Sequence, residues 1–213
     1  MLVDLTHTIR EGMPVYPGTE PPTLKPASSY ERDGYRETLL SMFSHTGTHV
    51  DAPAHIVKGA RVLDDFSADE LVGRGVVVDC RDVGCGGVIG MDRLLALGDE
   101  LRRAEFILFA TGWDKLWGTD DYYGGFPVVS PEVLEFIISS DVKGIGFDTI
   151  SLDPVGDVNL TYHKRLFSEK SIINIENLTG LEGLIGKSFT LYCLPMKFEN
   201  SDGAPARVVA ATE

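Results

Sequence analysis

Histidines and a carboxylate gather between residues 45 and 55 of this sequence. The stretch contains His45, His49, Asp51 and His55, and thus three of the five histidines of the chain. Imidazole and carboxylate groups are ligands of first-row divalent metal ions in proteins. Their density predicts a metal site; the alternative is a polar loop with scattered histidines.

The spacing within the stretch indicates which side chains share a face. A glycine and a proline between the histidines argue against one continuous helix. Side chains alternate along an extended strand, so His45, His49 and Asp51 are expected on one face. His55 follows the proline, where the chain is expected to turn. We therefore predict that the first three hold one ion, and that His55 lies beside it and moves a proton.

Two residues later in the chain extend the predicted site. Glu176 directly follows an apolar run, so its carboxylate is either exposed at a strand end or directed into the site. If His163 and Glu176 converge on the first cluster, a second ion fits, bridged by Asp51 and Glu176. Such a site lowers the pKa of bound water to about 7 and polarises a carbonyl group. The predicted chemistry is metal-assisted hydrolysis, because the sequence lacks a G-x-S-x-G elbow and an HExxH motif.

The elements that must position these residues include both strands and helices. The mixture predicts an α/β fold with a mixed sheet, in one domain over residues 1–213. Apolar runs predict strands over 2–6, 35–43, 75–80, 106–111, 143–147, 171–175, 188–198 and 206–211, and caps and spacing predict helices over 67–73, 91–103 and 130–140.

Two irregular segments are expected near the site. Residues 12–22 are rich in glycine and proline and carry Tyr16, and residues 112–129 carry Trp113 among other aromatic residues. Loops on a rigid scaffold often carry binding residues. We predict that Tyr16 and Trp113 flank a flat substrate; the alternative is that they only pack the loops.

Composition limits the kind of partner. The net charge of −13 would repel a phosphate backbone, so no nucleic acid is expected. No apolar run approaches the roughly 18 residues of a membrane span, and no signal peptide is visible. Three cysteines are too few for a disulfide framework. These features predict a cytoplasmic enzyme for a small-molecule substrate, and we expect a homodimer or larger homo-oligomer.

The stretch from His45 to His55 resembles the H-x-x-x-H-x-D-x-x-x-H signature of the cyclase-like family that includes bacterial kynurenine formamidase. Residues 4–7, 14–18, 111–113, 146–154 and 175–178 resemble other motifs of that family. The resemblance implies a swivelling β/β/α fold, hydrolysis of N-formylkynurenine, and two metal ions, usually zinc and in some members manganese. It implies His45, His49 and Asp51 on the first ion, Asp51, His163 and Glu176 around the second, and His55 as proton donor and acceptor.

Other interpretations stay open. Within the same family, the enzyme could instead open the ring of a cyclic imide, lactam or lactone. The metal could also be purely structural, or the protein a catalytically inactive binder, although the presence of His55 argues against the latter. Formamidases of this family tend to carry tryptophan where Tyr16 stands. His7 is expected to have a structural role, or to orient a ligand through its second ring nitrogen.

Overall fold

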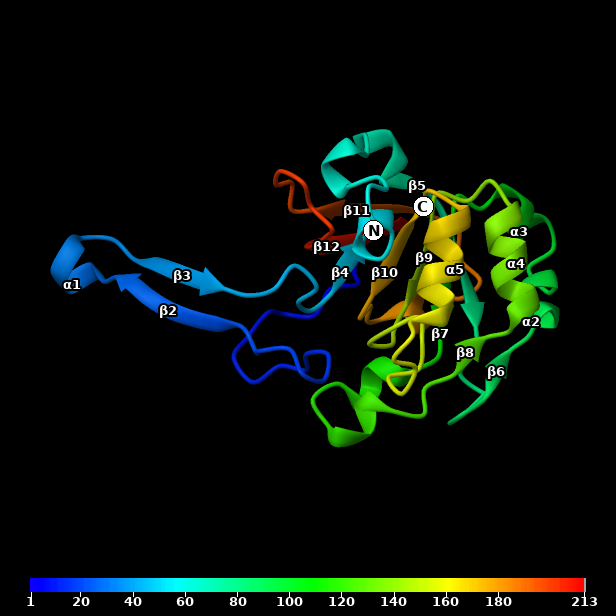
Figure 1. The fold of residues 1–213 in the computed structure, drawn as a ribbon, viewed down its shortest axis with the longest axis horizontal. Helices are drawn as coiled ribbons and strands as arrows, with labels where there is room; N and C mark the ends of the chain where they lie inside the picture. Colours follow the sequence, from blue (N-terminus) through cyan, green and yellow to red (C-terminus); the bar gives the residue numbers. More distant parts are fainter. Residues whose placement is uncertain (213) are drawn as a thin grey trace.

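The computed structural model describes residues 1–212, and a closed sheet of eight strands organises them (Figure 1). The strand order is β1-β12-β11-β5-β7-β9-β10-β4, and β4 pairs in turn with β12. Strands β5, β7, β9 and β10 are parallel and the other pairs antiparallel, so the predicted mixed sheet is confirmed. The strands are β1 (Leu2–Asp4), β4 (His49–Asp51), β5 (Val72–Asp79), β7 (Phe106–Ala110), β9 (Gly144–Phe147), β10 (Ile173–Glu176), β11 (Phe189–Pro195) and β12 (Gly203–Thr212).

Alternate residues of the central strands fill two apolar layers. Val77 and Leu108 belong to the core enclosed by the sheet, whereas Val76 and Ile107 pack in the layer beneath the helices. Parallel strands buried on both faces are expected to be apolar throughout, as β7 is. Figure 1 shows the helices together on one side of the sheet: α2 (Met91–Leu95), α3 (Asp99–Arg103), α4 (Pro131–Ser139) and α5 (Thr161–Glu169).

Helix α4 begins where its sequence signals place it. The Ser130 hydroxyl accepts a hydrogen bond from the Val133 amide at 3.3 Å, and Pro131 occupies the first turn. The helix predicted over 91–103 is instead two short helices, because Gly98 adopts a φ of +56° between them.

The helix predicted over 67–73 is reduced to one 3-10 turn. Ser67 and Glu70 do form the predicted capping box, but β5 begins at Val72 and ends the turn. Among residues 1–212, no helix has the length and apolarity needed to cross a membrane. The remaining short elements are β6 (Val88–Ile89), paired with β8 (Val128–Val129), and the 3-10 turns Pro53–His55, Leu63–Asp65, Ala68–Glu70, Trp113–Leu116, Asp120–Tyr123 and Leu181–Leu184.

A hairpin that we call the arm, residues 23–41, projects from the body of the molecule (Figure 1). It consists of β2 (Thr23–Ser28), α1 (Tyr30–Asp33) at the tip, and β3 (Glu37–Ser41). All five residues of β3 are exposed, including Leu39 at 59% and Leu40 at 51% of their surface. The strand predicted over 35–43 therefore lies in the arm and not in the main sheet.

Candidate metal centre

Sheet register brings the first residues of the site together. Strand β4 carries His49 and Asp51, and in the antiparallel pair with β10 these lie directly opposite Glu176 and Asn174. Directly opposite residues in a sheet present their side chains on the same face. Four polar side chains from segments distant in sequence thus share one buried face.

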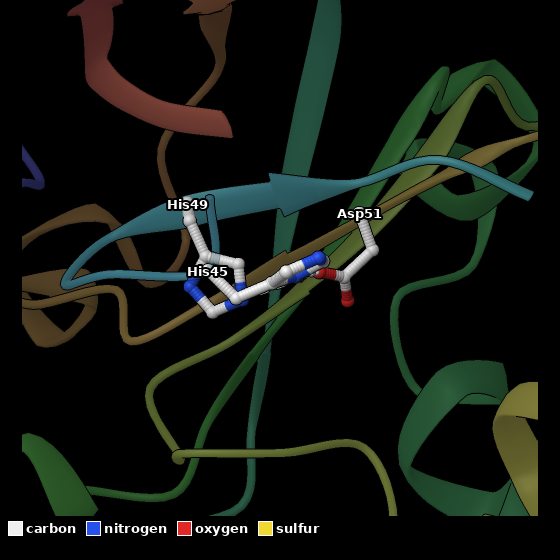
Figure 2. A group of neighbouring side chains, drawn as sticks. All are labelled: His45, His49 and Asp51. Carbon is white, nitrogen blue, oxygen red and sulfur yellow. Dashed lines mark hydrogen bonds and ion pairs between the residues drawn. The ribbon is translucent and has the colours of Figure 1, made fainter. Parts of the chain in front are cut away.

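His45 reaches this face from a turn and not from the strand. β4 begins only at His49, and Gly47 bends the chain before it with a φ of +68°. The prediction of one extended strand from position 45 is therefore wrong, although His45 Nδ1 does lie 2.7 Å from Asp51 Oδ1. The turn needs room, because a Cβ atom at Gly203 would stand 2.3 Å from the His45 ring. Figure 2 shows the two imidazoles and the carboxylate gathered beside β4.

The two predicted groups of candidate ligands both form, and they share Asp51. In each group the possible ligand atoms lie within 4.8 Å of one another. Asp51 Oδ1 is 3.2 Å from His49 Nε2, and Asp51 Oδ2 is 3.5 Å from His163 Nε2, so each carboxylate oxygen faces one group. Glu176 Oε1 lies 3.2 Å from His163 Nε2. Imidazole and carboxylate donors in this arrangement fit divalent ions such as zinc or manganese.

His45, His49 and His163 are each held by a contact to one ring nitrogen. In each case it is the nitrogen that points away from the group of candidate ligands. Such outer contacts fix the tautomer and ring orientation of metal-binding histidines. They pair His49 Nδ1 with Gly47 O (2.8 Å), His163 Nδ1 with Asp153 Oδ2 (2.6 Å) and His45 Nε2 with Asp202 Oδ2 (3.2 Å).

The sequence analysis did not identify the residues that hold the candidate ligands in place, namely Asn174, Asp153 and Asp202. Asn174 donates from Nδ2 to Asp51 Oδ2 and to Glu176 Oε1, both at 2.9 Å. A signal existed, because Asn174 stands two positions before Glu176 and alternate residues of a strand share a face. Asp153 lies in the polar turn after β9. No local signal identifies Asp202, which precedes β12.

Burial and close contacts shift the pKa values of the candidate ligands. Asp51 is 1% exposed, which raises its pKa, but His49 and the other histidines hold that pKa well below the usual range. Burial lowers the pKa of His45, yet its hydrogen bonds to Asp202 and Asp51 raise the value to about 10. Asp202 and Asp51 thus hold a proton on His45, and a metal ion that binds there must displace it.

His55 differs from the other histidines of the cluster. It ends the 3-10 turn after β4, and its ring centroid lies 3.9 Å from that of His45. Its closest recorded carboxylate contact is Asp202 Oδ2, 3.9 Å from Nδ1, which is beyond a hydrogen bond. Burial lowers the pKa of His55. His45, His55 and Asp202 form a further group of candidate ligands.

A cavity of about 580 Å³ lies above the cluster. Its apolar walls come from residues 14–17 and from the loop over 150–160. The two walls meet where the Tyr16 hydroxyl donates to Val155 O at 3.5 Å. Tyr16 thus forms part of the cavity wall above the cluster.

Trp113 does not line this cavity. Its indole nitrogen donates to Tyr122 O at 3.1 Å, and its ring borders a separate cavity of about 410 Å³ beside Cys85. His7 does not orient a candidate ligand either, because its ring stacks on Trp117 with centroids 3.9 Å apart and its Nε2 has no hydrogen-bond partner in the described part of the chain. Of the predicted substrate contacts, the structure brings only Tyr16 to the cluster.

Comparison with known proteins gives the family that the stretch from His45 to His55 resembles. The sequence model of the family described as "Putative cyclase" matches residues 3–154. An uncharacterized protein of Methanocaldococcus jannaschii is 31% identical over 98% of both chains. A kynurenine formamidase of Salinibacter ruber is 27% identical over 98% of this chain and 96% of its own.

Solved structures are similar over the same extent. Isatin hydrolase A from Labrenzia aggregata, bound to benzyl benzoate, superposes with a TM-score of 0.88 at 27% identity, covering 100% of this chain and 94% of its own. A structure described as a potential metal-dependent hydrolase with cyclase activity has a TM-score of 0.78 at 29% identity, covering 99% and 96%.

Proposed function

The chain belongs to the cyclase family of metal-dependent hydrolases, and we propose that it cleaves the C–N bond of a small amide next to a flat ring. The observation that carries this proposal is Asp51, which faces two groups of candidate ligands at the base of one cavity. A structural site is closed by its protein ligands, whereas a catalytic site keeps a position open to substrate. The cavity supports the catalytic alternative.

The first candidate substrate is N-formylkynurenine, which would give kynurenine and formate. Kynurenine formamidases from several bacteria support it, because their similarity spans almost the whole chain. The second candidate is a cyclic imide, lactam or lactone whose ring is opened. The likeness to isatin hydrolase A over the complete chain favours this alternative.

In this proposal the ligand sets are those of the two groups. His45, His49 and Asp51 would hold one ion, and Asp51, His163 and Glu176 a second. A divalent ion bound there lowers the pKa of water to about 7 and polarises a carbonyl oxygen. Zinc suits the nitrogen and oxygen donors, and manganese is the alternative.

His55 is the proposed proton carrier. It lines the cavity beside His45, and among residues 1–212 it has no carboxylate partner within hydrogen-bond distance. A ring nitrogen of His55 takes a proton from the attacking water and delivers it to the leaving nitrogen. Tyr16 supplies a flat wall for the substrate ring, a contact worth about 1 kcal/mol.

Hydrolysis assays of the zinc- or manganese-loaded protein test the proposal. We expect turnover of formanilide or N-formylkynurenine, lost together with the metal in Asp51→Ala. We expect Tyr16→Ala to raise KM more than it lowers kcat, and Tyr16→Trp to be neutral or beneficial on an aryl formamide. The two-metal site would be contradicted by folded protein that holds less than one ion per chain and takes up no more when zinc or manganese is added. If a cyclic substrate is preferred a hundredfold over the aryl formamide, the formamidase assignment is wrong and ring opening takes its place.

We also propose that the arm joins two copies of the chain. A two-stranded hairpin is marginally stable alone, and unpaired strand edges tend to find partners. The arm exposes Leu39 and Leu40, as well as both of its edges. It leads directly to Phe43, which is 52% exposed and lines the cavity. A second copy would cover this apolar surface close to the site.

A further inference from the structure

Two carboxylates on the cavity wall have no place in the ligand groups that share Asp51. Asp157 and Asp202 both line the cavity, one from the loop before α5 and the other from the residue before β12. They approach from segments far apart in sequence. Their common feature is a fixed negative charge facing the space that a substrate would occupy.

Asp157 is held in place by the start of α5. Its Oδ1 accepts a hydrogen bond from the Asn159 amide at 2.9 Å, and its Oδ2 accepts one from the Thr161 amide at 3.2 Å. Hydrogen bonding from Thr161 and Asn159 lowers the pKa of Asp157. The side chain is thus an ordered carboxylate and not a mobile surface charge.

Asp202 is held by the sheet and by His45. Its carbonyl oxygen accepts the Ala52 amide at 2.9 Å, and Asp64 binds the amides of the two preceding residues. Asp202 Oδ2 lies 3.2 Å from His45 Nε2. About half of its side chain remains exposed, so it can still meet a ligand.

Apart from the histidine cluster at its base, the rest of the wall offers no opposite charge. Among residues 1–212, no lysine or arginine lines the cavity. Lys164 acts on Asp157 from α5, but it is exposed and is not part of the lining. The other wall residues are mainly apolar: Pro14, Val15, Tyr16, Pro17, Phe43, Ile150, Val155, Val158 and Leu160.

Building on the proposed function, we propose that this wall selects substrates without a free carboxylate. The ring would rest on the apolar residues, and Asp157 and Asp202 would repel an anionic substituent and accept an uncharged or cationic one. Specific sites commonly reject wrong ligands by placing like charges together. Within the candidates above, cyclic amides and neutral aryl formamides would therefore be used in preference to substrates with a free carboxylate, of which N-formylkynurenine is one.

Matched substrate pairs on the metal-loaded full chain test the selection. One pair is 3-formamidobenzoate and its methyl ester, which share the scissile bond and differ in one charge. The other is N-formylkynurenine and its methyl ester. In each pair we expect kcat/KM for the ester to exceed that for the acid by about tenfold or more, mainly through KM.

Charge reversal at Asp157 tests whether the wall charge causes the difference in kcat/KM between ester and acid. Asp157→Lys should reduce the ester-to-acid ratio to about one or below, and Asp157→Asn, which keeps a side-chain acceptor for α5, should give an intermediate ratio. Glu169→Lys is the matched control, because it makes the same charge change on α5 at its last residue, outside the cavity lining. The control should keep the wild-type ratio. Thermal melts identify any variant that has lost its fold.

The outcomes separate the inference from its premise. If the acids are cleaved as well as the esters, or better, the wall does not select by charge and the inference is wrong while the proposed hydrolase stands. If no formamide or cyclic amide in any charge form is cleaved by protein that holds its metal, the proposed function is wrong and the inference falls with it.

Discussion

Asn174 lies directly opposite Asp51 where β10 pairs with β4, and its amide nitrogen donates to Asp51 Oδ2 at 2.9 Å. The same nitrogen donates to Glu176 Oε1, also at 2.9 Å. One neutral amide therefore fixes oxygens of two buried carboxylates that would otherwise repel each other. It makes the orientation of both proposed ligands depend on a residue that offers the metal no charge.

Asn174→Ala should weaken metal binding without removing a ligand. Loss of an outer contact typically costs about 10- to 100-fold in metal affinity. Competition with a chromophoric chelator measures this change. Asn159→Ala is the control, because Asn159 is exposed and lies outside the cluster. Equal affinity in wild type and Asn174→Ala would show that the two hydrogen bonds do not orient the ligands.

His55→Ala and His49→Ala should separate a proton carrier from a ligand. We expect His55→Ala to keep most of its metal and to lose about 100-fold or more in turnover, the scale for removal of a general acid or base. His49→Ala should lose both metal and turnover. Elemental analysis and kcat on the same preparations measure the two effects. If His55→Ala loses metal as His49→Ala does, His55 is a ligand.

His7→Phe should make the fold less sensitive to acid. Burial lowers the pKa of His7 to about 4, so the unfolded chain binds more protons than the folded one between pH 6.5 and 4. The free energy of unfolding contributed by His7 therefore falls as pH falls through that window. Phenylalanine can keep the stack on Trp117 without a titrating nitrogen. Melting temperatures from pH 7 to 4.5 should fall more steeply for wild type, and parallel curves would contradict the prediction.

The double variant Leu39→Asp, Leu40→Asp should be monomeric. Light scattering after size exclusion should give about 23 kDa for it, the mass of one chain, and twice that or more for wild type. Leu95→Asp, which changes an exposed leucine on α2, should leave the wild-type mass unchanged. A monomeric wild type would refute the proposed role of the arm.

The local part of the site could be predicted from sequence, because residue types and short spacings carry that information. Glu176 directly follows the apolar run that forms β10, and His49 and Asp51 stand two positions apart in β4, on either side of one valine. The helix that carries His163 was missed for a physical reason. Leu160 before it has a φ of +50° and provides no side-chain cap, and Asp153 and Asp157 bind its first amides from further upstream.

Contacts set by sheet register lay beyond sequence reasoning. Asn174 meets Asp51 across 123 positions, and Asp202 meets His45 across 157. No local pattern encodes such pairs, because a shift of one residue in either strand would turn the side chains to the opposite face. The single domain over 1–213 stays a prediction. The pairing of β1 with β12 agrees with it, because that pairing joins the first and last strands in one sheet.

The pairing of β12 with β4 also has a consequence for the order of synthesis. His45 leaves the ribosome 157 residues before Asp202, which is about 8 to 30 s at the usual rate of translation. Until β10 has been made β4 lacks both of its neighbours in the closed sheet, and it lacks β12 and the Asp202 carboxylate for the whole interval. Ribosome-bound chains that end before β10 should therefore bind no zinc at this site; tight binding by such chains would contradict this. We expect metal insertion to follow translation, as the last step by which the nascent chain becomes an enzyme.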